Sequence, residues 1–272
     1  MNSVLALGLA LPLFVSTPDP VTAPPAASAA VTLAFDHTHA AWTELLRNRF
    51  TSTGFDYASL LKDSKPVDDY LAALAAVDAA DFATWKREQQ LAFWINAYNA
   101  YTLKRVLQSY PFEKVNELGA DKKGPWDERF IPLGKLAPDL KQEKLTLNEL
   151  ENKILRPKFK DARIHAAINC AAESCPPLRP EAFVAERLDR QLDIQVLKWL
   201  GNPAFNRIDA AKNELQLSAL FDWYKKDFVD EAGSVEAWIA KHGPKETVAW
   251  LEKAKDVKTT YFDYSWKLNT AR

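Results

Sequence analysis

One segment of the sequence constrains the fold more than any other, because it is apolar on every side for most of its length. It runs from Thr84 to Pro111 and reads TWKREQQLAFWINAYNAYTLKRVLQSYP. Thr84 is suited to cap a helix, and Pro111 is suited to end one. Apolar residues occupy nearly every side between Leu91 and Leu107, and a helix of that kind is buried. The sequence therefore predicts a central helix against which the other elements pack.

Two asparagines interrupt the apolar surface of this predicted helix. Asn96 and Asn99 share one stripe, at spacings of three and four residues, with Ala92, Leu103 and Val106. A buried side-chain amide must find hydrogen-bond partners or its burial costs free energy. Asn96 and Asn99 are therefore expected either to clamp the backbone of a loop or to line a polar binding pocket. The clamp is favoured, because most side-chain hydrogen bonds go to backbone or water.

The rest of the chain reads as helices with a few short strands, so we predict an α+β fold: a helix-dominated single domain with a small, mostly antiparallel sheet. Apolar spacing, caps and breakers indicate helices over 42–50, from Pro66, from the capping box at 146–149 to Pro157, from Pro180 to Gly201, and after Ser218. Strands are expected at 164–169, in a hairpin formed by FNRID and ELQLS, and at TTYFDYSW.

The N-terminus resembles a secretory signal. An apolar run from Val4 to Val15 is too short to span a bilayer, and Ala27-Ser28-Ala29 offers a small-x-small cleavage site, although no Lys or Arg precedes the run. We therefore expect a signal peptide and cleavage region over 1–30, an N-terminal helical extension over 31–79 and the main domain over 80–272. The mature protein is expected in the periplasm or outside the cell, without a transmembrane segment. A net charge of -1 gives no reason to expect a nucleic-acid partner.

The most distinctive stretch, IHAAINCAAESCPPL, holds His165 and both cysteines, Cys170 and Cys175. In an exported chain a disulfide between them is the default expectation, and it would shape a loop more than hold the fold. The alternative is a thiol active site, with Cys175 or Cys170 as nucleophile, His165 as base and Asn169 orienting the ring. A strand here would turn Cys170 away from His165. With no second ligand cluster we expect no metal site, and we expect no cofactor.

Five blocks in one order resemble the DUF547 family, in an exported bacterial member, over roughly Ala80 to Asn269: FWINAYNA, LTLNELENKILRP, DARIHAAINCAAESCPPL, LFDWYKKDF and YSWKLN. The resemblance implies no settled activity. It marks motif positions that carry over to this chain as the residues to test, namely Asn96, Asn99, His165, Cys170 and Cys175. The last block departs from the family, since Ser265 stands where an Asp is usual. Any role of that carboxylate is therefore in doubt for this chain.

These observations lead to two functional hypotheses, and they leave open whether the protein is an enzyme. The first is an exported cell-envelope or extracellular binding domain with a disulfide-pinned His/Cys loop, whose partner is an unknown small molecule or envelope component. Trp126, in a polar loop, is a candidate cleft residue beside Asn96 and Asn99. The second is a cysteine-dependent hydrolase or acyltransferase that uses Cys175 or Cys170 with His165.

Overall fold

The central element is α5, Arg87–Ser109, whose side chains are buried without interruption from Leu91 to Leu103. The predicted central helix is thereby confirmed, but its cap is Lys86 and not Thr84. Thr84 is instead the last residue of the preceding helix, where its hydroxyl donates to the Asp81 carbonyl at 2.7 Å. Gln89 accepts a hydrogen bond from the Lys86 amide at 2.9 Å, which satisfies the first free N–H of α5.

The structure is a computed structural model that describes residues 34–51, 53–119 and 124–271. The signal peptide predicted for 1–30 lies outside the described residues. From Phe35 onward the chain forms one compact unit. Among its described helices, none combines the length and the apolar character needed to cross a membrane.

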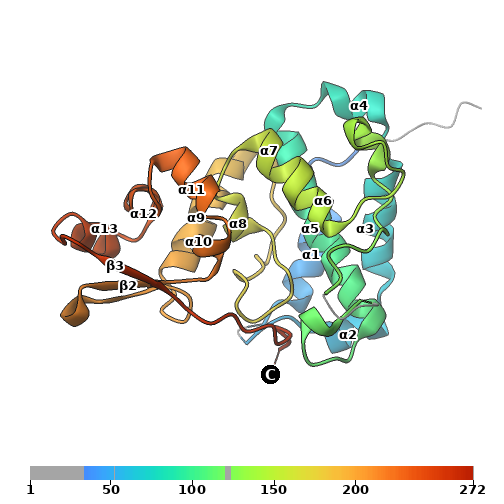
Figure 1. Ribbon diagram of the computed structural model, residues 1–272. Helices are drawn as coiled ribbons and strands as arrows, with labels where there is room; N and C mark the ends of the chain where they lie inside the picture. The colour runs from blue at the N-terminus through green and yellow to red at the C-terminus, as the bar shows by residue number, and fades with distance from the viewer. Residues whose placement is uncertain (1–33, 52, 120–123, 272) are drawn as a thin grey trace, which may run out of the picture. The chain divides into compact units, whose positions relative to one another are not determined.

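Four helices precede α5 in the sequence, and buried side chains of all four belong to the same apolar core as α5 (Figure 1). Trp42 of the first helix stacks on Tyr70 of the third, with ring centroids 5.2 Å apart. Pro66 lies in the first turn of that third helix, as expected. The four helices are α1 Ala40–Arg49, α2 Tyr57–Lys62, α3 Lys65–Ala76 and α4 Ala79–Thr84.

The helix predicted from the capping box runs further than expected. Thr146 and Glu149 form the predicted box at the start of α6, Leu147–Glu149. A π-helical segment, Leu150–Leu155, then leads directly into α7, Arg156–Phe159. Pro157 was expected to end the helix, but it lies in the first turn of α7, where its missing N–H costs least.

The strand predicted at 164–169 is wrong: Ile164–Ala167 is a single helical turn, α8. Alternation of side chains carries no information here, because all six residues are buried. Alanine also has a high helix propensity. The turn lets α8 contribute to two apolar clusters, with Ile164 and Ala167 packed beside α5 and Ala166 packed in the C-terminal half.

The C-terminal half packs around stacked aromatic rings, including Trp199 and Phe221 with centroids 4.7 Å apart. The helix expected from Pro180 begins only at Leu188, because the backbone of Ala182, Phe183 and Val184 is held by side-chain hydrogen bonds from other elements. The helices of this half are α9 Leu188–Leu200, α10 Leu220–Trp223, α11 Lys225–Ala232, α12 Val235–His242 and α13 Lys245–Leu251.

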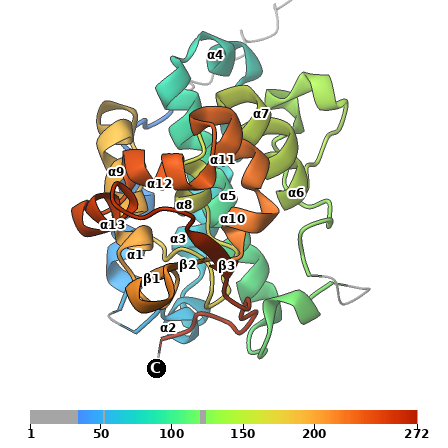
Figure 2. The same ribbon diagram turned by 60° about the vertical axis from the view of Figure 1, so that its left-hand side comes forward.

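The sheet is small and mixed, so the helix-dominated α+β class is confirmed. β1 (Arg207–Asp209) and β2 (Glu214–Leu217) form the predicted antiparallel hairpin, with Ile208 opposite Leu215. β3 (Lys258–Tyr261) pairs with β2 in parallel, which departs from the mostly antiparallel sheet expected. It returns to the sheet only after α10 to α13, and a long crossover of this kind permits parallel pairing. Figure 2 brings these strands and α12 forward.

Short 3₁₀ turns connect several of these elements. They are η1 Val115–Glu117, η2 Gly134–Leu136, η3 Pro138–Leu140, η5 Ala185–Arg187 and η6 Ala210–Lys212. The first three lie in the described parts of the long connection between α5 and α6.

Stability is expected to fall in mild acid because of His39, which caps α1 in a left-handed conformation. Its Nδ1 lies 2.7 Å from the Tyr70 hydroxyl, and burial lowers its pKa from 6.5 to about 4. The unfolded chain takes up this proton near pH 6.5, so the contribution is complete above that pH and is lost as the pH falls toward 4. The loss of free energy of unfolding should reach about 3 kcal/mol, measured by urea unfolding.

His39→Asn should remove most of this pH dependence, because asparagine tolerates the left-handed backbone conformation but has no group that titrates in this range. His242→Asn is the control and should retain it.

Candidate functional site

A cavity of about 190 Å³ lies where α5, α6 with the π-helical segment that follows it, α8, α10 and the C-terminal segment meet. Its aromatic side is formed by Trp126, Trp223, Tyr264 and Trp266. Trp266 is central to this group, with ring centroids 4.5 Å from Tyr264 and 5.3 Å from Trp126. Polar groups of the cavity include His165, Glu151, Asn148 and the Tyr98 and Tyr224 hydroxyls, and both cysteines line it. Residues far apart in the sequence thus build one concave site.

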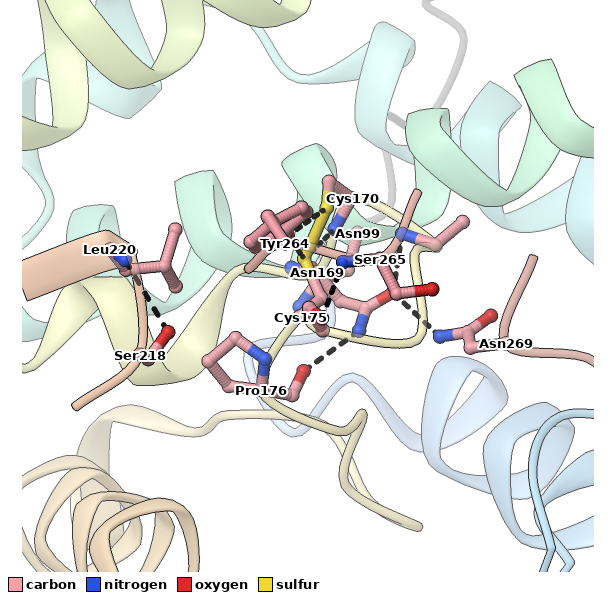
Figure 3. The surroundings of a disulfide bond; sticks show 12 residues. Asn99, Asn169, Cys170, Cys175, Pro176, Ser218, Leu220, Tyr264, Ser265 and Asn269 are labelled. Atoms are coloured by element: carbon pink, nitrogen blue, oxygen red, sulfur yellow. Dashed lines mark hydrogen bonds between the residues drawn. A yellow bond between two sulfur atoms is a disulfide. The ribbon is translucent and has the colours of Figure 1, made fainter. Parts of the chain in front are cut away.

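The Cys170–Cys175 disulfide forms one wall of the cavity and confirms the predicted pairing (Figure 3). The Tyr264 hydroxyl donates toward Cys175 Sγ at 3.3 Å and lies 3.1 Å from Cys170 Sγ. The loop between the cysteines pairs with the C-terminal segment, because the Glu173 amide donates to the Lys267 carbonyl at 2.7 Å. The disulfide and the last residues described therefore fix each other.

The asparagines of α5 hold the backbone on both sides of this loop. Asn99 donates to the Ala167 carbonyl at 3.0 Å and accepts from the Asn169 amide at 2.8 Å. Asn96 makes the same pair of bonds with the carbonyl and the amide of Phe183, at 2.8 and 3.0 Å. Each side chain thus satisfies one donor and one acceptor of a buried, irregular segment.

Asn169 secures the loop from within. Its Nδ2 donates to the Pro176 carbonyl at 2.8 Å, and its Oδ1 accepts from the Ala171 amide at 2.8 Å (Figure 3). Ala171 has a φ of 67°, a left-handed conformation that costs free energy for a residue with a Cβ. The polar contacts of Asn169 therefore help to hold a strained turn next to the disulfide.

His165 is oriented by Asp227 and not by Asn169. Its Nε2 lies 2.8 Å from Asp227 Oδ2, and its ring stacks on Tyr224 with centroids 4.1 Å apart. Arg156 binds the same carboxylate through Nε and Nη2, at 2.6 and 3.0 Å. Partial burial acts to raise the pKa of Asp227, but hydrogen bonds from His165 and Arg156 outweigh it and hold that pKa well below its usual value. The carboxylate stays ionised and fixes the imidazole at the cavity.

Glu151 places a carboxylate in the same cavity, although its side chain is only 5% exposed. The Tyr98 hydroxyl donates to its Oε2 at 3.5 Å, a long hydrogen bond. Burial, and then the charge of Glu151, raise the pKa of the Tyr98 and Tyr224 hydroxyls well above the usual range. Both tyrosines therefore remain neutral hydrogen-bond donors in the cavity.

Trp126 depends on a glycine for its place at the rim. Gly124 has a φ of 90°, and a Cβ built on it would overlap the Trp126 ring. The Trp126 carbonyl also accepts from the Asn148 amide at 3.0 Å, which ties this loop to α6. The ring position is thus set by backbone contacts on both sides of the residue.

The structure brings together four of the residues singled out from the sequence: His165, Cys170, Cys175 and Trp126 all line the cavity. Asn96, Asn99 and Asn169 are buried and bind backbone groups nearby. His165 and both cysteines line the same cavity because residues 164–167 form a helical turn. A strand at this position would have turned Cys170 away from His165.

The sequence did not single out two groups of the site, Asp227 and Glu151. Asp227 lies 62 residues from His165, and only its place in the LFDWYKKDF block marked it. Glu151 did leave a local signal, because it shares the apolar helix stripe of Leu147, Leu150 and Ile154. A carboxylate in such a stripe is expensive to bury and is therefore a candidate for function.

A wider surface hollow of about 740 Å³ is a weaker candidate. Its charged residues are largely paired with one another: Arg163 binds Asp161, Asp189 and Asp193, and Glu231 binds Lys241 and His242. Among the residues that the structure describes, no group of three His, Cys, Asp or Glu side chains is arranged to hold a metal ion.

A family model described as "Protein of unknown function, DUF547" matches residues 82–200. This match includes α5, the capping box, α8 and the disulfide loop. No curated protein and no solved structure matches the chain significantly.

Asn99→Ala should destabilise the protein by about 3 kcal/mol, because it leaves the buried Asn169 amide and the Ala167 carbonyl without partners. The change in the free energy of unfolding can be measured by urea denaturation. Asn48→Ala is the matched control, since Asn48 is an exposed asparagine in a helix, and it should change stability by less than about 0.5 kcal/mol. Equal effects of the two substitutions would contradict the clamp.

Proposed function

We propose that this chain, which belongs to the DUF547 family over residues 82–200, is an exported domain that binds a small molecule in the cavity beside the Cys170–Cys175 disulfide. The family description assigns no activity, so the proposal rests on the site. The ligand is a small molecule or a small group of an envelope component, because the cavity holds about 190 Å³.

One observation carries the binding proposal: the cavity combines a buried carboxylate with an exposed tryptophan, and both cost free energy unless a ligand contacts them. Glu151 is a buried carboxylate without a close ion-pair partner among the described residues, and Trp223 exposes 48% of its large apolar surface at the rim. Concave sites with aromatic walls and a few convergent polar groups are the usual form of small-molecule sites.

Export is supported by the disulfide together with the signal-like N-terminus. Disulfides persist in the periplasm and outside the cell, and they are rare in the reducing cytosol. Asn169, Asn99 and Tyr264 all shape the loop around the bonded form of Cys170 and Cys175. A periplasmic or secreted location therefore suits the protein.

Binding in this cavity should alter tryptophan fluorescence, because three indoles line it. A panel of small compounds with ammonium, hydroxyl or carboxylate ends should contain at least one that gives a saturable change in emission. Trp266→Leu should weaken that binding by about tenfold or more, because Trp266 contacts three of the other rim rings. Trp250→Leu, in α13 and away from the cavity, should leave the affinity unchanged. Saturable binding that survives Trp266→Leu would place the ligand elsewhere.

A second candidate function is a thiol-dependent acyl transfer or hydrolysis in the reduced protein. The observation that favours it is the Asp227–His165 pair, since His165 lines the same cavity as both sulfurs. A dithiol reductant would open the disulfide and itself become a cyclic disulfide. One cysteine would then lose its proton to His165 and attack a carbonyl carbon, and the leaving group would take up that proton.

This second function predicts unequal thiol reactivity after reduction with dithiothreitol. Iodoacetamide should alkylate one of Cys170 and Cys175 faster than the other, and His165→Ala should slow that reaction about tenfold by removing the base. His242→Ala is the control, because His242 pairs with Glu231 outside the cavity. Equal, slow alkylation of both cysteines in all three proteins would exclude a thiol active site.

A further inference from the structure

The charge within the cavity is unbalanced. Glu151 is its one carboxylate among the described lining residues, and no Lys or Arg lines it. Glu151 has a relative exposure of 5%, so its carboxylate is almost entirely removed from solvent. Its hydrogen-bond partners are the neutral hydroxyls of Tyr98, at 3.5 Å, and of Tyr224, so no Lys or Arg of the lining compensates the loss of water around the carboxylate.

The basic side chains close to Glu151 in the sequence bind other groups or face solvent. Arg156, one turn further along the same helix, donates to Asp227 through two nitrogens and to Asn152 Oδ1 through the third, at 2.5 Å. Lys153 is exposed. The other titratable groups of the lining are His165, which is held by the carboxylate of Asp227 at 2.8 Å, and three phenols. Burial, and then the charge of Glu151, raise the pKa of Tyr98, Tyr224 and Tyr264, so these hydroxyls stay neutral.

The aromatic rim adds to the attraction for positive charge. Trp223 stacks on Trp266 with centroids 5.8 Å apart and planes 12° apart, and it remains 48% exposed. Tyr264 lies 4.8 Å from Trp223 and completes the group. Indole and phenol faces carry negative electrostatic potential and attract cations, above all when water is excluded.

The geometry points to an organic cation as the ligand of this cavity, with an ammonium or guanidinium group held between the rim indoles and the Glu151 carboxylate. This inference rests on the proposed binding function and names the ligand class. An anion would be repelled by Glu151 and would meet no Lys or Arg there. A neutral polar ligand, such as a sugar, could stack on the indoles but would leave Glu151 without a charged partner.

The test compares two probes of nearly equal shape, choline and 3,3-dimethyl-1-butanol, in which a carbon replaces the charged nitrogen. Their affinities for the full exported protein are measured by calorimetry and by tryptophan fluorescence. Choline should bind the wild type about tenfold more tightly than the alcohol. Glu151→Gln should lower that preference to about threefold or less, because only the attraction of the rim rings remains, and it should leave binding of the alcohol unchanged. Trp223→Ala, at an exposed position that does not threaten folding, should weaken choline several-fold and serves if Glu151→Gln does not fold.

The outcomes separate the cation assignment from the binding function. Equal binding of both probes by the wild type would overturn the cation assignment and leave a neutral-ligand site in place. A choline preference that Glu151→Gln leaves unchanged would overturn the assignment of Glu151 as the partner of the cation. Binding of neither probe at millimolar concentration would count against the cation and against the small-molecule cavity together. A preference for choline that Glu151→Gln lowers supports both.

Discussion

The structure depends on two side-chain amides that bind backbone N–H and C=O groups, as a neighbouring strand would in a sheet. Asn96 and Asn99 of α5 each offer one donor and one acceptor to a segment of irregular backbone, at distances between 2.8 and 3.0 Å. Buried backbone groups that lack partners cost about as much as a lost hydrogen bond each. A helix cannot supply such partners from its own main chain, so the two asparagines are what allow the backbone of Ala167, Asn169 and Phe183 to be buried.

The site follows from that arrangement. Once Asn99 fixes the end of α8, the ring of His165 is held by Asp227 of α11 and by Tyr224, which lies between α10 and α11. The disulfide then closes the loop, and Tyr264 covers both sulfurs from the C-terminal segment. The break between α10 and α11 leaves Trp223 exposed at the rim while Tyr224, the next residue, contacts His165. Helices, the disulfide loop and the C-terminal segment therefore position the polar groups of the cavity together.

Local sequence signals predicted the elements whose stability is local. The all-round apolar α5, the Thr146–Glu149 capping box and the β1–β2 hairpin each carry their own pattern, and each is present. The prediction failed where tertiary contacts decide. Residues 164–169 are buried on every side, so no periodicity could separate a strand from the helical turn of α8. The pairing of His165 with Asp227 joins positions 62 residues apart, and no single-sequence pattern encodes such a distance.

The C-terminal segment has a consequence for the order in which the site forms. Tyr264 contacts Cys170 across 94 residues of chain, and Asn269 contacts Asn169 across 100. Contacts so distant in sequence carry a high loop-closure entropy and tend to form late in folding. During synthesis, the helices around α5 can pack before residues 264–269 have left the ribosome. The aromatic wall of the cavity is then added last, because Tyr264 and Trp266 both follow β3 in the sequence.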